Sequence, residues 1–327
     1  MKISVAMCTY NGARFISEQL ESIAAQSQPI DELVVCDDQS TDNTLQLIKN
    51  FQDRVSFSIR IYVNEQNLGS TRNFAKCLSL CEGDVIFLCD QDDVWLTHKV
   101  KKMLAYLAQN PEQEAVFSDA NIINDQSALT GKRAWQLIQF NRRMQTRWQL
   151  GGAFDILVNG YVVTGATLAV RRRILAELLP FPTLYKELIH DGWIALWLSL
   201  TNRIGFLKEP LTHYRQHSHQ QVGFGEAAPK VTIEERIVRS REKKLAPLQK
   251  KYAESQILYD YLASFDTIPT DKLEQLRQRS DHFLMRSTLP DNHLRRVQPV
   301  LKDVFNGKYK NHNAAKWWRP VLGDIFE

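Results

Sequence analysis

The chain has 327 residues, 44 % hydrophobic and 24 % charged, which is the composition of a folded globular protein. No stretch reaches the roughly 20 apolar residues that a membrane span requires, and the N-terminus has no signal-peptide pattern, so we expect a cytoplasmic protein. The net charge is +4, and the basic excess lies after residue 227. All five cysteines precede residue 90 and none forms a C-x-x-C pair, which predicts buried reduced thiols.

Apolar runs rich in β-branched residues recur along the first 90 residues, at 3–10, 32–38 and 84–90, with a weaker one at 55–64. Helical patterns separate them, at 13–27, 41–51 and 69–81. This alternation predicts an α/β fold with a mainly parallel sheet and helices on both faces. Ligands of such sheets bind beyond the carboxyl ends of the strands, where the polar clusters "TYNGA", "DDQSTDNT" and "DQDD" lie.

The remainder of the chain contains a strand-like run at 114–124 and a helix expected at 190–200. From about residue 231 the pattern becomes helical. We therefore expect an N-terminal domain, residues 1–225, and a basic helical region, residues 226–327. The boundary is expected near the loop "GFGEAAP".

The stretch "VIFLCDQDDVW" carries an apolar strand directly into acidic residues. Asp90 and Asp92 are two positions apart, so both carboxylates can enter one cleft, where a divalent cation would bridge to phosphates. The alternative is a solvated acidic turn. No G-x-G-x-x-G or P-loop motif is present, which argues against the dinucleotide and P-loop folds.

The second strand ends in a similar acidic pair. Asp38 needs a nearby donor or cation because it follows Asp37, and a base edge or a ribose would supply one. Ser40, Thr41 and Asp42 alternatively cap the next helix.

Four stretches in series, "AMCTYNGARF", "VVCDDQSTDNT", "NEQNLGSTRNF" and "DVIFLCDQDDVW", resemble the nucleotide-binding half of family 2 glycosyltransferases with a GT-A fold. The resemblance is strong over residues 1–100, looser to about 223, and closest to the bacterial rhamnosyltransferase-like subset. It implies a GT-A-type Rossmann-like sheet. Residues 1–100 would form the nucleotide-binding half and 101–225 the acceptor-side half.

The resemblance also implies roles at individual positions. Thr9 and Tyr10 would border the base, and Asp38 would accept a hydrogen bond from the ring N–H. Arg72 would reach the base or the phosphates. Asp90 would contact the ribose or the metal, and Asp92 would be the main ligand of Mn²⁺ or Mg²⁺.

Two later motifs extend the resemblance. Gly165, in "VTGATLAVRR", is expected in a loop that lines the acceptor side of the donor site. "LIHDGWIALW" stands where the family carries its catalytic acid, so Asp191 is the expected base, with His190 and Trp193 beside it. Asp191 is alternatively the N-cap of the following helix.

Further candidates flank these motifs. Asp93 would support the metal ligands from behind, or cap a helix that begins near Trp95. In "HYRQHSHQQ", which also contains His213 and His219, His217 best fits a third metal ligand. Arg215 alternatively balances the charge of the diphosphate.

The implied function is an inverting, metal-dependent transfer of a sugar from a nucleoside diphosphate donor, dTDP-L-rhamnose or a UDP-sugar. The acceptor would be a hydroxyl of a bacterial cell-surface glycan or of a lipid-linked saccharide. A D-x-D phosphatase and a non-catalytic glycan- or lipid-binding protein are the alternatives.

The tail, residues 295–327, interleaves basic residues with Trp317, Trp318 and Phe326. This pattern suits an anionic membrane surface. The alternative is a helix docked on the core through the same aromatic side chains. No nucleic-acid-binding module is recognisable.

Overall fold

The structure is a computed structural model that describes residues 1–217, 220, 240–312 and 317–326. The chain divides into two compact units, Met1–Phe224 and Gly225–Glu327. The boundary predicted at "GFGEAAP" and the candidate His219 lie outside the described residues.

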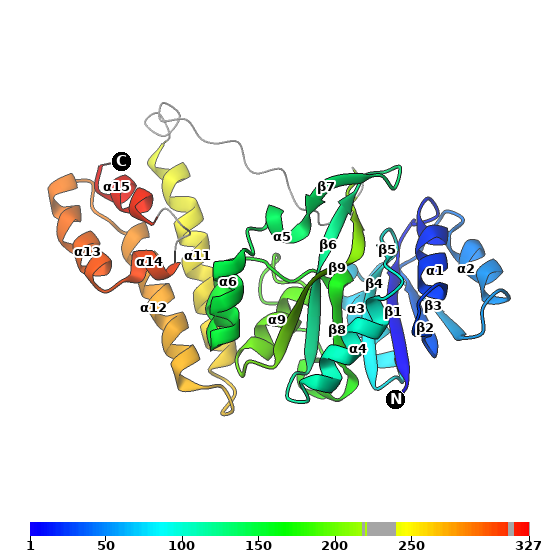
Figure 1. Cartoon of the computed structure of the whole chain (residues 1–327). Helices are drawn as coiled ribbons and strands as arrows, with labels where there is room; N and C mark the ends of the chain where they lie inside the picture. The colour runs from blue at the N-terminus through cyan, green and yellow to red at the C-terminus, as the bar shows by residue number, and fades with distance from the viewer. Residues whose placement is uncertain (218–219, 221–239, 313–316, 327) are drawn as a thin grey trace. The chain divides into compact units, whose positions relative to one another are not determined.

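A single mixed sheet organises the first unit (Figure 1). In the described residues it has nine strands: β1 (Ile3–Thr9), β2 (Glu32–Asp37), β3 (Ser58–Val63), β4 (Val85–Asp90), β5 (Val94–Trp95), β6 (Ala115–Ile123), β7 (Leu129–Arg133), β8 (Leu168–Arg171) and β9 (Ile204–Arg215). Their order is β3-β2-β1-β4-β8-β6-β9-β5, with β7 paired to β6.

The strands β1, β2, β3 and β4 are parallel, as the alternating pattern predicted. β8 is antiparallel to both β4 and β6, and β6 is parallel to β9. β9 also pairs antiparallel with the short β5. The end of β9 is therefore brought beside the acidic loop that leaves β4, although more than a hundred residues separate them.

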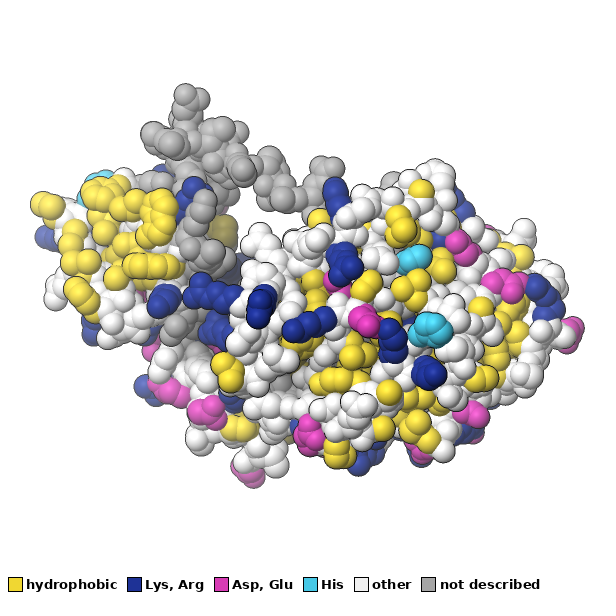
Figure 2. Space-filling model, in the orientation of Figure 1, with side chains coloured by type: hydrophobic (Ala, Val, Ile, Leu, Met, Phe, Trp, Pro, Cys, Tyr) yellow, Lys and Arg dark blue, Asp and Glu magenta, His cyan; other side chains and the backbone are white. Residues whose placement is uncertain are grey.

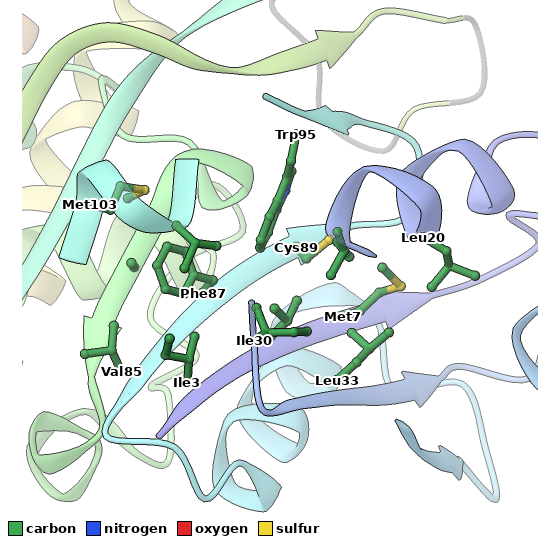
Figure 3. Packing of buried hydrophobic residues seen from close by; sticks show 14 of the residues in the cluster. Ile3, Met7, Leu20, Ile30, Leu33, Val85, Phe87, Cys89, Trp95 and Met103 are labelled. Carbon is green, nitrogen blue, oxygen red and sulfur yellow. The ribbon is translucent and has the colours of Figure 1, made fainter. Parts of the chain in front are cut away.

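Helices cover both faces of the sheet, as predicted. Alternate side chains of β1, β2 and β4 pack against α1 (Ile16–Ala24), α2 (Thr44–Gln52) and α4 (Lys99–Gln109), in the core that Figure 3 shows. α3 (Ser70–Leu80) packs on β1 and β2 and also contacts α9 (His190–Ser199). Both faces of these parallel strands are buried, which explains their nearly continuous apolar runs.

Shorter helical segments complete the first unit: α5 (Ala134–Leu137), α6 (Arg142–Arg147), the π-helical turn Trp148–Gly152, α7 (Ala153–Asn159), the 3₁₀ turns Gly165–Thr167 and Arg172–Ile174, and α8 (Leu175–Leu178). All five cysteines are free thiols; four are buried and Cys8 is half-buried.

One sequence expectation about helix starts is wrong, and another holds for a single residue. Trp95 lies in the strand β5, and the next helix begins only at Lys99, so Asp93 caps no helix. Of the three residues 40–42, Asp42 bonds to the start of α2, since its Oδ1 accepts from the backbone N–H of Thr44 at 3.0 Å.

The second unit is helical and contains α11 (Arg241–Leu262), α12 (Thr270–Ser287), α13 (His293–Phe305), α14 (Lys308–His312) and α15 (Trp318–Phe326). Leu289, Val300 and Tyr309 are buried in its core. In the described ranges, no helix of either unit combines the length and the apolar composition needed to cross a bilayer. Residues 313–316 and 327 of the predicted basic tail lie outside the described residues.

Candidate active site

The carboxyl ends of β1, β2 and β4 lie side by side. Thr9 is in register with Asp37, and Cys8 is in register with Asp90. The polar residues that follow these strands therefore meet along one edge of the sheet, as predicted from the α/β pattern.

The loop after β4 presents the acidic pair. Burial, then the carboxylates of Asp92 and Asp191, raise the pKa of Asp90 to about 7. Charges repel one another to this extent only at short range in a poorly solvated space, so the three carboxylates face a common region. Asp191 is separated from Asp90 by about a hundred residues of sequence, and only the fold brings them together.

These residues fit a hard divalent cation. Carboxylate oxygens are the donors that Mg²⁺ and Mn²⁺ prefer, and a cation would relieve the repulsion that raises the pKa of Asp90. His217 lies beside the pair, with Nε2 2.8 Å from Oδ2 of Asp92. Among the described residues, no three His, Cys, Asp or Glu side chains are grouped to hold a metal ion.

Asp93 faces the interior, away from solvent. Its Oδ1 accepts a hydrogen bond from the backbone N–H of Arg215 at 2.9 Å, while Oδ2 has no partner within the described part of the chain. Burial, followed by the charges of Asp92 and Asp90, raises its pKa well above the usual range. Asp93 therefore supports the acidic loop from below, the first of its two predicted roles.

A buried lysine beneath this loop was not anticipated. Lys99 is fully buried, and its Nζ donates to the carbonyl of Ala166 at 2.5 Å and to Oγ1 of Thr212 at 3.0 Å. Nζ also lies 4.0 Å from the centroid of the Trp95 ring. Burial lowers the pKa of Lys99 to about 8, although the nearby acids oppose this shift. Within "THKVKK" the residue looks like one more surface lysine, so no sequence signal marked it.

Arg215 does not face a ligand, contrary to the alternative role suggested for it. The side chain is fully buried, and Nε donates to the carbonyl of Asp92 at 2.6 Å. Its remaining nitrogens donate to the carbonyl of Asn124, to Ser127 and to Glu18. With these donors occupied, Arg215 fixes the acidic loop from behind.

The first strand end is held by polar contacts. Thr9 is buried, and its hydroxyl donates to Oδ2 of Asp37 at 2.7 Å. The backbone N–H and carbonyl of Tyr10 both bond to the amide of Gln91, each at 2.9 Å, while the Tyr10 ring is 46 % exposed. Thr9 is therefore structural, and Tyr10 offers an open ring beside the acidic loop.

Asp38 is satisfied by the protein itself. Its Oδ1 accepts from the amide of Asn64 and from the backbone N–H of Leu68, both at 2.7 Å, and Oδ2 accepts from the N–H of Gly69 at 2.9 Å. The donors that the sequence seemed to require from a base are thus supplied by the loop before α3. One acceptor position of the carboxylate remains, so contact with a base stays a prediction.

Arg72 lies in the first turn of α3 and is exposed. Within the described ranges it forms no ion pair, so its guanidinium remains available to an anionic ligand.

Gly165, His190 and Asp191 form a tight group, although 24 residues separate the first two. Oδ2 of Asp191 accepts from the N–H of Gly165 at 2.8 Å. A Cβ at Gly165 would lie 3.0 Å from Nε2 of His190 and 3.5 Å from Oδ2 of Asp191. Glycine at this position therefore allows the backbone to approach the predicted base.

Asp191 is not the helix N-cap, because α9 begins at His190 with Ile189 as N-cap. Its Oδ1 accepts from the backbone N–H of Gly192 at 2.7 Å. The hydroxyl of Tyr161 lies nearby, since burial and then the charge of Asp191 raise the pKa of that phenol. Sequence reasoning missed Tyr161, and no motif signalled it.

His190 stacks on Phe74 of α3, with ring centroids 4.1 Å apart. It is 5 % exposed, and burial lowers its pKa while Asp191 opposes the shift. Trp193, by contrast, is 2 % exposed and packs against Trp197. Trp193 is a core residue, contrary to its predicted place on the acceptor side.

The chain is similar to known proteins in sequence and in structure. The family description "Glycosyl transferase family 2" matches residues 4–179, more than half of the chain. The dTDP-rhamnosyl transferase RfbG of Shigella flexneri is 28 % identical over 227 residues, covering 66 % of this chain and 73 % of RfbG. The chain spans 65 % of the length of an uncharacterized glycosyltransferase of Nostoc and 47 % of the length of the putative glycosyltransferase EpsE of Bacillus subtilis.

Two solved structures share the architecture. TarS of S. aureus in complex with UDP-GlcNAc has a TM-score of 0.54 at 19 % identity, covering 95 % of this chain and 89 % of that one. The mannosyltransferase PcManGT of Pyrobaculum calidifontis, in complex with GDP-Man and Mn²⁺, has a TM-score of 0.50 at 16 % identity, with 99 % and 85 % covered. The match to the family argues against the phosphatase alternative. The chain belongs to glycosyl transferase family 2 and has the GT-A fold.

Proposed function

We propose that the chain is an inverting, metal-dependent glycosyltransferase that moves a sugar from a nucleoside diphosphate donor to an acceptor hydroxyl. The observation that carries the proposal is the convergence of Asp90, Asp92 and Asp191: burial, together with the charges of Asp92 and Asp191, raises the pKa of Asp90 to about 7. Such a cluster suits a site where a cation and a diphosphate neutralise two of the acids while the third acts on the acceptor.

Each residue has a defined task. Asp90 and Asp92 would hold Mn²⁺ or Mg²⁺, with His217 orienting Asp92 or completing the ligand set. The bound metal supplies neutralisation of the charge that develops on the leaving diphosphate. Arg72 adds a positive charge to the phosphates, and Tyr10 stacks on the base.

Asp191 accepts the proton of the acceptor hydroxyl. Two backbone N–H groups, from Gly165 and Gly192, keep its carboxylate oriented. A carboxylate is a sufficient base because the hydroxyl becomes acidic only as its oxygen bonds to the anomeric carbon. Attack on the face opposite the diphosphate inverts that carbon in one displacement.

The donor and acceptor follow from the relatives. RfbG is named a dTDP-rhamnosyl transferase, and TarS was solved with UDP-GlcNAc, which favours dTDP-L-rhamnose or a UDP-sugar here. One relative from Escherichia coli is named for a diphosphoundecaprenol-linked acceptor. We infer a cell-surface glycan or lipid-linked saccharide as acceptor. Residues 1–225 would be the catalytic domain, with the nucleotide-binding half at 1–100 and the acceptor-side half at 101–225.

The test is a donor screen with the full chain. Thermal stability and released nucleoside diphosphate are measured for a panel of nucleotide sugars with and without Mn²⁺. A true donor and Mn²⁺ together should stabilise the protein more than either alone. Asp92→Asn should lose the Mn²⁺-dependent increment, whereas Asp119→Asn, a buried acid of β6, should keep it. No response to any nucleoside diphosphate would contradict the proposal, and a product that retains the donor's anomeric configuration would contradict inversion.

A further inference from the structure

Hydrophobic side chains gather on the surface of the second unit over α13 and α15 (Figure 2). On α13, Leu294, Leu301 and Phe305 recur at helical spacing along one side of the helix. Leu294 and Phe305 are 85 % and 84 % exposed. Single exposed apolar side chains are common on protein surfaces, but here three share one face of a helix.

α15 repeats the arrangement. Trp318, Leu322 and Phe326 are spaced four residues apart and are 48 %, 47 % and 70 % exposed. The two helices pack together, and the carbonyl of Ile325 lies 2.9 Å from Nδ1 of His293. We call the six exposed side chains the α13–α15 face.

The residues of the α13–α15 face are not needed for the hydrophobic core of the second unit. The opposite sides of both helices already pack inside the unit, through Val300 and Val304 on α13 and Val321 and Ile325 on α15. The exposed residues therefore add no packing to the core of the unit, and their exposure to water is unfavourable in free energy.

Acidic residues of these helices point inward. Asp303 pairs with the buried His282 at 2.8 Å. Asp324 accepts from Arg286 and from the hydroxyl of Tyr309, both at 2.6 Å. Neither acid contributes negative charge to the outer surface.

Four basic residues of α13, α14 and α15 point outward, whereas Arg296 of α13 is buried. Arg295, Lys302, Lys310 and Arg319 are exposed, and none forms an ion pair within the described residues. The guanidinium of Arg319 lies 5.6 Å from the ring centroid of Trp318. These four side chains place positive charge around the α13–α15 face, and the exposed Asp291 just before α13 is paired with Arg241.

We propose that the α13–α15 face docks on an anionic lipid surface, with its apolar side chains inserted at the headgroup level and its basic residues against the lipid phosphates. Aromatic and aliphatic side chains bordered by Lys and Arg are the chemistry that such an interface binds. A second copy of the chain would bring the same positive charges together and is disfavoured. Docking itself does not depend on the proposed function. Only its biological role rests on that function, because a lipid-linked acceptor would be presented at such a surface.

The experiment is co-sedimentation of the full chain with vesicles of phosphatidylcholine alone or with phosphatidylglycerol. The wild type should sediment with the anionic vesicles only, and less so at high salt. The triple change Phe305→Ser, Leu322→Ser and Phe326→Ser should weaken binding at least tenfold. Arg295→Gln and Lys302→Gln should each weaken it about fivefold.

Matched controls separate docking from folding. Ile257→Ser and Leu284→Ser alter side chains that are 40 % and 39 % exposed on α11 and α12, and should bind as the wild type does. Sedimentation velocity and thermal melting are measured on every variant. Equal binding by the triple variant, no preference for anionic vesicles, or a dimer that the triple change dissociates would overturn the proposal.

Different variants test the docking proposal and the proposed function, so the failure of one can be told from the failure of the other. Nucleoside diphosphate release should be unchanged in the triple variant when the acceptor is supplied in soluble form. Conversely, Asp191→Asn should bind vesicles like the wild type while losing transfer.

Discussion

Replacing Asp191 by asparagine removes the proposed base while changing little else in the shape of the site. The Asp191 carboxylate accepts two backbone hydrogen bonds, from Gly165 at 2.8 Å and Gly192 at 2.7 Å. An asparagine has one carbonyl oxygen, so its NH₂ group must face the other N–H. One buried donor is then left unpaired, which costs about 1–3 kcal/mol of stability.

The effect on catalysis should be larger than this. Loss of a positioned general base lowers kcat by roughly 10²–10⁴, a barrier increase of about 3–5 kcal/mol. The affinity for the donor should be nearly unchanged, because Asp191 acts on the acceptor. The assay is nucleoside diphosphate release with the donor and acceptor that respond best, beside a thermal melt and a donor titration.

Asp119→Asn is the matched control. Asp119 is also buried and also accepts from two backbone N–H groups, those of Ala120 at 2.8 Å and Trp135 at 3.0 Å. Both bonds end on Oδ1 of Asp119, so the carbonyl oxygen of an asparagine can accept them both. Asp119→Asn should therefore lose less stability than Asp191→Asn, and only Asp191→Asn should lose turnover. If Asp191→Asn keeps a rate within tenfold of Asp119→Asn at a temperature where both are folded, the assignment of the base is wrong.

Three further predictions concern the surroundings of the site. Gly165→Ala should lower kcat about tenfold, because its Cβ would lie 3.0 Å from Nε2 of His190 and push against the residue next to Asp191. Gly160→Ala, where no atom lies within 4 Å of the added Cβ, should be neutral, and equal rates for the two variants would refute the argument. Lys99→Met should reduce the free energy of unfolding in urea by about 1–3 kcal/mol, because the buried carbonyl of Ala166 and Oγ1 of Thr212 lose the hydrogen bonds that Lys99 donates. A loss of stability no greater than that caused by a surface lysine substitution would contradict this prediction. Burial lowers the pKa of His190 in the folded state, so the unfolded chain binds the extra proton and stability falls as pH drops below about 6.5. His190→Gln should therefore show a smaller decrease in melting temperature from pH 7.5 to 5.5, and an unchanged decrease would refute the shift.

The sheet and the place of the site were readable from sequence because they depend on local periodicity. Alternation of apolar runs and helical patterns specifies parallel strands, and parallel strands bring their carboxyl ends to one edge. Asp90 and Asp92 could be placed at that edge on this basis, since Asp90 is the last residue of β4 and Asp92 follows two residues later.

Roles that depend on long-range contacts could not be read in this way. Asp38 looked as if it needed a ligand, because nothing in "VVCDDQS" reveals that residues 64–69 return to supply its donors. Arg215 looked like a phosphate ligand, and only the pairing of β9 with β5 shows that it is buried under the acidic loop.

The sequence by itself therefore determined the α/β architecture, the family and the positions of the acidic motifs, because these are properties of neighbouring residues. Tertiary structure alone decided which polar groups face one another: Asp191 beside Asp90, Lys99 beneath the acidic loop, and the outward apolar faces of α13 and α15. The physical reason is that charge, burial and hydrogen bonding act through space, and the chain brings residues a hundred positions apart into contact only when it folds.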